Sequence, residues 1–316
     1  MITRRAWLAG LAWLGAGLAA GCGSAPVTGP GLTVVTAPLS TSLVTAQGTW
    51  AVAVMGGSAA SEDNFWQLFV KPTGTTRWTF VTPEGVADNG GLVATGGAGG
   101  ASLLVGFRPS QGLAFSPLAA SSDTGKNWTP GLLDADLADV PDALAVGASG
   151  QALALLNDGS IEEAPTAAAA NAGQWSQLTT LSALASSAPG RACGLAGVNA
   201  VSFGVNDTLM AAGSCVRRGV AGVFAETGGT WQAAGPALPA GFGGDQVQVL
   251  GLASTAGGTA ALMEAGSSLI AAWSGTSGWT VSAPVAVSTV VASGFGPSGG
   301  VWVLLGHLVM GGGRLR

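Results

Sequence analysis

The fold is decided by the stretch Ser121-Ser122-Asp123-Thr124-Gly125-Lys126-Asn127-Trp128, which reads S-x-D-x-G-x-x-W. It lies between an apolar run, 112–120, and Pro130. Ser and Asp side chains accept hydrogen bonds from turn amides, and Gly125 tolerates the positive φ that a tight turn requires. Trp128 then begins a returning strand and buries a large ring. The pattern predicts a β-hairpin in which Asp123 is a turn acceptor and not a catalytic acid.

Tryptophans recur along the chain in the position that Trp128 takes in this hairpin. They are Trp78, Trp128, Trp175, Trp231 and Trp279, at intervals of 47 to 56 residues. A weaker copy of the turn motif precedes one of them, with Glu226 in place of the aspartate, followed by Gly228 and Trp231. A period near 50 residues is typical of four-stranded repeat units. We therefore expect each of these tryptophans to begin the outer strand of one such unit.

A second recurring feature is a glycine-flanked apolar segment ahead of each turn, which indicates an inner strand of the same unit. The six segments are 49–54, 101–105, 151–156, 208–212, 259–263 and 301–305. There are six segments against five tryptophans, so the last unit lacks its outer strand. Residues 32–35, Leu-Thr-Val-Val, form a strand-like segment with no unit of its own. Pairing it into the last unit would remove open sheet edges, which otherwise promote aggregation.

The S-x-D-x-G-x-x-W motif and its echoes resemble the Asp-box, or BNR repeat, of sialidase-like β-propellers. The resemblance covers residues 31–316 and implies an all-β, six-bladed propeller closed by an N-terminal strand. Seven blades is the alternative, since weak repeats are easily miscounted. A β-sandwich does not explain the period. In such propellers the Asp-box turns lie on one face, and ligands usually bind at the opposite rim.

The composition agrees with short strands and turns. The chain of 316 residues has 48% hydrophobic and 9% charged residues, 53 glycines and no tyrosine. This much apolar surface argues against disorder. The formal net charge of −5, without a Lys/Arg patch, argues against nucleic-acid binding.

The N-terminus has the pattern of an export signal, which we assign to residues 1–21. Arg4 and Arg5 precede an apolar run, 6–20, that is too short for a spanning helix. The run ends in Leu-Ala-Ala-Gly before Cys22 and resembles a bacterial lipobox, which implies lipidation of Cys22 and a tether over 22–30. An ordinary secretory signal is the alternative. The twin-arginine-like start leaves both the Sec and Tat export routes open. The expected location is the bacterial cell envelope, on the extracytoplasmic side of the membrane.

Two further cysteines, Cys193 and Cys215, flank residues that read as a hairpin with a turn near 204–207. They could therefore face each other across adjacent strands. An exported chain can keep a disulfide, so we expect one here, with two buried thiols as the alternative.

Many of the charged residues of this chain fall in the connections that we expect at the face opposite the Asp-boxes. The rim residues that we consider candidates for ligand binding are Glu62, Asp63, Arg108, Asp134, Asp136, Asp139, Arg217 and Arg218. Loops are polar in general, so a solvated surface is the plainer interpretation.

No cofactor is expected. The acidic run that contains Asp134, Asp136 and Asp139 offers oxygens of the kind that Ca²⁺ binds, but it lacks the glycine and the final glutamate of an EF-hand loop. A solvated connection is the favoured interpretation of this run.

The resemblance to sialidases does not extend to their chemistry, because their nucleophile is a tyrosine and this chain has none. Fold does not carry function across. The sequence favours a monomeric, lipid-anchored, non-enzymatic module that binds or assembles a protein or polysaccharide of the cell envelope. A glycan-active hydrolase or lyase that uses rim carboxylates is the alternative.

Overall fold

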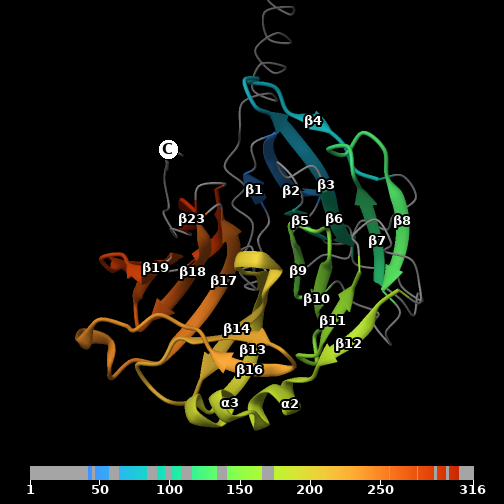
Figure 1. Ribbon diagram of the computed structural model, residues 1–316. Coiled ribbons are helices and arrows are strands. Elements are labelled where there is room, and N and C mark those ends of the chain that lie inside the picture. Colours follow the sequence, from blue (N-terminus) through green and yellow to red (C-terminus); the bar gives the residue numbers. More distant parts are fainter. Residues whose placement is uncertain are drawn as a thin grey trace, which may run out of the picture. The chain divides into compact units, whose positions relative to one another are not determined.

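The computed structural model describes a chain built almost wholly of antiparallel strands (Figure 1). It describes residues 42–44, 47–56, 64–83, 91–96, 102–107, 116–133, 141–165, 174–255, 257–275, 277–287, 290–296 and 299–305. The expectation of an all-β fold is confirmed.

The first three sheets each contain four strands, hydrogen-bonded in chain order. The first sheet consists of β1 (Ser42–Val44), β2 (Gly48–Gly56), β3 (Asn64–Pro72) and β4 (Thr79–Phe80). The second consists of β5 (Gly91–Gly96), β6 (Ser102–Phe107), β7 (Ser116–Ser121) and β8 (Thr129–Leu133). The third consists of β9 (Ala143–Val146), β10 (Ala152–Leu155), β11 (Ile161–Ala164) and β12 (Ser176–Thr179).

Two further four-stranded units follow, joined by a single pairing of Ser214 with Gln248. The fourth sheet contains β13 (Leu195–Phe203), β14 (Leu209–Cys215), β15 (Gly222–Thr227) and β16 (Thr230–Ala233). The fifth contains β17 (Val247–Thr255), β18 (Gly258–Ala265), β19 (Ser268–Gly275) and β20 (Gly278–Val281), and β21 (Val285–Ala286) pairs with β19. The sixth sheet, as far as the structure describes it, has β22 (Val290–Phe295) and β23 (Val301–Leu305).

The sheets follow one another through their first strands. The strand β1 contacts β5, β5 contacts β9, β9 contacts β13, β13 contacts β17, and β17 contacts β22. The strand β22 in turn contacts β1. Residues 32–35, which we expect to complete the last unit, lie outside the described residues, so the count of six blades and the N-terminal closure stay predictions.

The tryptophan repeat marks the fourth strand of each of the first five sheets. One tryptophan comes directly before or within each of these strands, which are β4, β8, β12, β16 and β20. The six apolar segments correspond to the second strands β2, β6, β10, β14 and β18, and to β23. The prediction of repeated four-stranded units from these two periodicities is confirmed.

The core lies between neighbouring sheets. Between the first and second sheets, Trp50 and Leu68 pack with Leu103, and all three side chains are fully buried. Trp50 and Leu68 alternate with more exposed neighbours along their strands. In the second sheet both faces are covered, since Leu104, beside Leu103, is also fully buried and packs in a different cluster. Burial of such a side chain contributes about 1.5–3 kcal/mol, so these apolar layers hold successive sheets together.

Two short helices, α2 (Leu181–Ser186) and α3 (Ala188–Cys193), connect β12 of the third sheet to β13 of the fourth. The sequence did not predict them. Thr180 and Ser187 cap them by accepting hydrogen bonds from the amides of Ala183 and Gly190, both at 3.1 Å. Cys193 is the last residue of α3, and Cys215 is the last residue of β14. The two form a disulfide with a Cα–Cα distance of 5.3 Å.

A carboxylate links the third and fourth sheets. Asp207, in the turn between β13 and β14, accepts hydrogen bonds from the amides of Ala148 (2.7 Å) and Ser149 (2.8 Å) in the turn between β9 and β10. Burial acts to raise the pKa of Asp207, but hydrogen bonds from Ala148 and Ser149 outweigh it, and the pKa is lowered. The charged form therefore joins two turns that are far apart in the sequence.

Candidate functional site

The Asp-box turn between β7 and β8 is held by hydrogen bonds of three side chains, those of Ser121, Asp123 and Asn127. The Ser121 hydroxyl donates to Asp123 Oδ1 (2.8 Å) and accepts from the amide of Gly125 (2.9 Å). Asp123 Oδ1 accepts from the amides of Lys126 (3.1 Å) and Asn127 (2.9 Å). The Asn127 side-chain amide donates to Asp123 Oδ2 at 2.6 Å. The carboxylate of Asp123 is thus occupied by the turn that it organises.

These hydrogen bonds stabilise the ionised form of Asp123. The backbone amide of Asn127, followed by its side chain and the Ser121 hydroxyl, lowers the pKa of Asp123 to about 2. Such a carboxyl is a poor proton donor at neutral pH. Asp123 is therefore a structural acceptor.

The turn also rests on the first sheet. Gly125 has a φ of 78°, and a Cβ at this position would lie 3.2 Å from Cη2 and Cζ3 of Trp50 in β2. The same Cβ would lie 3.3 Å from Trp128. The glycine is required both by the left-handed backbone and by the closeness of the two indoles.

The weaker motif of the fourth sheet forms a shorter turn. Thr227 pairs with Thr230, so the turn contains only Gly228 and Gly229, with φ values of 58° and 80°. The carboxylate of Glu226 accepts a hydrogen bond from the amide of Gly229. Trp231, which follows, packs against the core that includes the disulfide cysteines.

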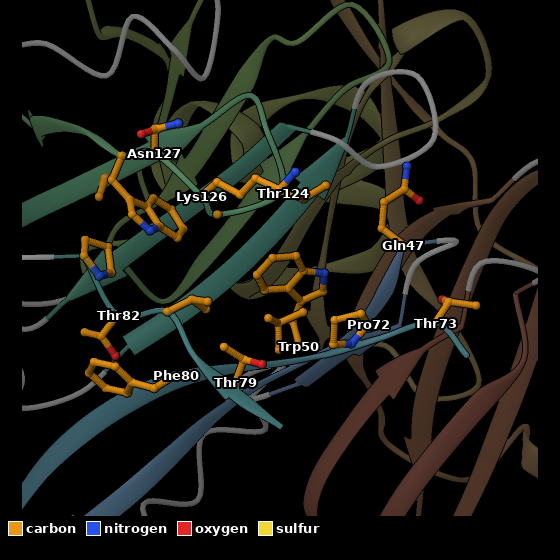
Figure 2. A pocket seen from close by; sticks show the side chains of 16 residues that line it. Gln47, Trp50, Pro72, Thr73, Thr79, Phe80, Thr82, Thr124, Lys126 and Asn127 are labelled. Atoms are coloured by element: carbon orange, nitrogen blue, oxygen red, sulfur yellow. The ribbon is translucent and has the colours of Figure 1, made fainter. Parts of the chain in front are cut away.

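A groove of about 1160 Å³ separates the Asp-box hairpin from the outer part of the first sheet (Figure 2). One wall is the continuous stretch 79–83, and the other is the continuous stretch 124–128. Between the walls the lining includes Trp50 and Ala119, which are fully buried, and Val70, which is 8% exposed. The remaining lining residues are Gln47, Pro72 and Thr73. Figure 2 shows Lys126 and Thr124 on one wall, with Thr79, Phe80 and Thr82 on the other.

Two exposed aromatic side chains belong to the outer part of the first sheet: Phe80 lies in the groove wall, and Trp78 comes directly before that wall in the sequence. Phe80 is 57% exposed and stacks edge-on against Phe69, with ring centroids 6.0 Å apart. Trp78 is 48% exposed, and the Lys71 ammonium lies 5.6 Å from the centroid of its ring. Large exposed apolar side chains beside a groove are typical of binding surfaces. The sequence periodicity does not distinguish Trp78 from Trp128, Trp175, Trp231 and Trp279, which are all less exposed.

None of the rim residues that the sequence suggested belongs to the described lining of the groove. Arg217 and Arg218 are exposed in the connection between β14 and β15, and Arg218 donates to the carbonyl of Gly244 at 2.6 Å. The other six rim candidates, with Cys22, lie outside the described residues: Glu62, Asp63, Arg108, Asp134, Asp136 and Asp139. Ligand binding at that rim stays a prediction.

Two carboxyls of the third sheet have pKa values that shift in opposite directions. Burial, followed by the charge of Asp158, raises the pKa of Glu162 in β11. The side chain and amide of Ser160 lower the pKa of Asp158. Neither carboxyl lines the groove, so they provide no acid–base pair there.

Within the described ranges, no group of three or more His, Cys, Asp or Glu side chains is arranged to hold a metal ion. The residues proposed for Ca²⁺ lie outside these ranges. Among the same described residues, no helix has the length and hydropathy needed to cross a membrane.

The successive four-stranded antiparallel meanders, each ending in a tryptophan-led strand, define an all-β β-propeller.

No protein-family model and no curated protein matches the chain. Solved structures with some likeness include YCF48 bound to D1 peptide, with 12% identity over 85% of this chain and 77% of that one, and a TM-score of 0.46. YCF48 from Cyanidioschyzon merolae is 14% identical over 85% and 96%, with a TM-score of 0.41. A triple arginine-to-alanine mutant of AofleA from Arthrobotrys oligospora is 15% identical over 86% and 80%, with a TM-score of 0.47. Likenesses at this level carry no functional assignment to this chain.

Proposed function

We propose that this chain is a lipid-anchored, extracytoplasmic β-propeller that binds a protein or polysaccharide of the bacterial cell envelope without catalysing a reaction on it. The groove between the first sheet and the Asp-box hairpin is the observation that carries this proposal. It combines exposed Phe80, partly exposed Trp128 and several hydroxyl and amide side chains. Apolar surface with a few polar groups is the usual lining of a binding site.

The chemistry of the lining favours binding over catalysis. Among the lining residues that the structure describes, Lys126 is the one with a charged side chain, and there is no Asp, Glu, His, Cys or Ser. General acid–base or nucleophilic catalysis needs such groups within hydrogen-bond reach of the substrate. The exposed hydroxyl of Thr79 and the exposed ammonium of Lys126 suit recognition by hydrogen bonds.

Two features support the extracytoplasmic location. The disulfide between Cys193 and Cys215 is of the kind that persists in oxidising compartments. The lipobox-like sequence before Cys22 adds a route to membrane attachment.

The proposal is tested by retention of envelope components on the full-length chain in detergent. Thr79 is exposed, lines the groove and directly follows Trp78, and Thr280 is exposed and directly follows Trp279 in β20. Thr79→Arg places a long side chain in the groove, while Thr280→Arg adds the same side chain at the matched position of the fifth sheet.

We expect Thr79→Arg to weaken retention of a specific protein or polysaccharide about tenfold, which corresponds to ~1.4 kcal/mol, and Thr280→Arg to leave it unchanged. Equal retention by the wild type and both variants would contradict binding in the groove.

A further inference from the structure

The strand β4 is the last strand of the first sheet and forms part of one groove wall. In the sheet order β1-β2-β3-β4, β4 pairs on one side with β3, and its second edge carries no strand among the residues described. Thr79 and Phe80 are exposed, and the chain continues along the groove as far as Pro83. Open strand edges are templates for pairing with another extended segment.

The register of β3 and β4 shows which backbone groups face this edge. Phe69 is opposite Phe80, and the amide of Val81 donates to the carbonyl of Leu68 at 3.0 Å. In an antiparallel pair, hydrogen-bonded and non-hydrogen-bonded residue pairs alternate. Because Val81 is bonded to β3, the N–H and C=O of Phe80 point away from β3, toward the open edge.

The groove has the dimensions of a polymer site. Its volume of about 1160 Å³ exceeds the ~300–1,000 Å³ of typical small-molecule pockets. Both walls are continuous backbone stretches of five residues, 79–83 and 124–128. Such a site matches an extended chain that lies along β4, with alternate side chains on the sheet face that carries Thr79 and, opposite it in β3, Val70.

The charged side chain in the described lining of the groove is cationic, although the chain as a whole has a net charge of −5. Lys126 is exposed on the Asp-box wall. The neighbouring Asp123 carboxylate is occupied by hydrogen bonds from Ser121, Asn127 and the amide of Lys126 itself. The part of the lining that the structure describes includes no carboxylate, and the ammonium of Lys126 is complementary to an anionic group on the occupant.

From these observations we propose that the groove binds an extended polypeptide segment that adds to β4 as a further strand and places a carboxylate side chain beside Lys126. This inference rests on the proposed function and specifies its partner as a protein. A polysaccharide lacks the alternating backbone donors and acceptors that pair with a strand edge, so the position of Phe80 favours the polypeptide.

The test uses a displayed library of random decapeptides and, in parallel, an array of neutral and acidic oligosaccharides. Both are presented to the full-length protein in detergent, with Thr79→Arg as the groove-blocked variant and Thr280→Arg as the matched control. We expect enriched peptides that bind the wild type and Thr280→Arg but not Thr79→Arg. We expect these peptides to share alternating apolar residues and at least one carboxylate.

The enriched peptide is then N-methylated at one backbone amide at a time. Methylation of the amides that face β4 should weaken binding about tenfold through the loss of backbone hydrogen bonds, and methylation of the intervening amides should have little effect. Lys126→Gln, an exposed substitution that leaves the fold intact, should weaken binding of the acidic peptide by about fivefold or less, as expected for an exposed ion pair. It should leave binding of a peptide with Gln in place of the acid unchanged.

The outcomes separate this inference from the proposed function. An oligosaccharide that binds the wild type but not Thr79→Arg would overturn the inference and leave the groove as the binding site. Peptides whose binding does not depend on Thr79 or Lys126, or an N-methyl scan without a two-residue period, would also overturn it. Failure of the proposed function is measured independently, as envelope retention that is the same in Thr79→Arg and the wild type.

Discussion

Gly125 of the Asp-box turn lies directly against the indole of Trp50, so that a Cβ on residue 125 would be 3.2 Å from two ring atoms. Trp50 belongs to the second strand of the first sheet, and Gly125 belongs to the hairpin of the second sheet. The motif therefore shapes its own turn, fixes the distance between two sheets and forms one wall of the groove.

Gly125→Ala is expected to lower the free energy of unfolding by about 2–4 kcal/mol, because it combines a left-handed backbone with overpacking against Trp50. Gly74→Ala is a matched control: Gly74 has nearly the same φ, 79° against 78°, but no atom within 4 Å of its Cβ position. That variant should cost only about 1–2 kcal/mol. Urea unfolding measures both, and equal losses would show that the contact with Trp50 carries no energy.

Asp123 should contribute to a pH-dependent part of the stability. Its pKa is lowered from 3.8 to about 2 in the folded chain. A lowered folded pKa means that the contribution is complete above the unfolded pKa, near 4, and is lost as the pH falls toward 2. Asp123→Asn should remove this part of the pH dependence.

Thermal unfolding of the wild type and Asp123→Asn between pH 2 and pH 6 tests this expectation. The difference between the two melting temperatures should shrink as the pH falls. A difference that is constant across the range, or a carboxyl carbon of Asp123 that titrates near 4 by NMR, would contradict it.

The fold prediction depended on two periodicities, that of the tryptophans and that of the apolar segments, more than on any single motif. Tryptophans such as Trp128 and Trp279 begin outer strands because a large ring is needed where the hairpin returns. The apolar segments between them are buried second strands, as in β10 and β18. Repetition makes these signals readable even where the turn motif has eroded, as at Glu226.

Other features depend on contacts that the sequence does not reveal. The helices α2 and α3 have six residues each, and their caps, Thr180 and Ser187, are residue types that are also common in loops. The sequence around them therefore did not indicate helices. Asp207 reaches amides 58 and 59 residues away, and only the tertiary fold brings them together. The groove likewise combines stretches from two sheets, whereas the sequence directed attention to charged loops at the other rim.

The disulfide is expected to stabilise the fourth sheet. It closes a loop with a sequence separation of 22 residues, and a bridge over such a loop contributes about 3 kcal/mol in the chain-entropy model. A reducing agent should therefore lower the urea midpoint of the wild type. The double variant Cys193→Ala/Cys215→Ala should have the lower urea midpoint without reductant, and the reducing agent should not change it. Identical midpoints with and without reductant would count against the contribution.

Membrane attachment should depend on Cys22. Cys22→Ser is expected to move the protein from the membrane fraction to the soluble fraction or the medium, because two acyl chains are needed for stable anchoring. Cell fractionation measures this. The double variant Cys193→Ser/Cys215→Ser, which removes the two disulfide-bonded cysteines, is the control and should stay with the membrane. Retention of Cys22→Ser at the membrane would argue for another anchor.

Site-specific photo-crosslinking in intact cells tests the groove as the binding site most directly. A photoreactive phenylalanine analogue is placed at position 79 in the groove, at position 280 in the matched strand of the fifth sheet, and at position 217 in the connection between β14 and β15. Our account predicts a discrete crosslinked partner from position 79 and none from position 280 or 217. Crosslinks from position 217 with none from position 79 would place the binding surface at the opposite rim and contradict the account.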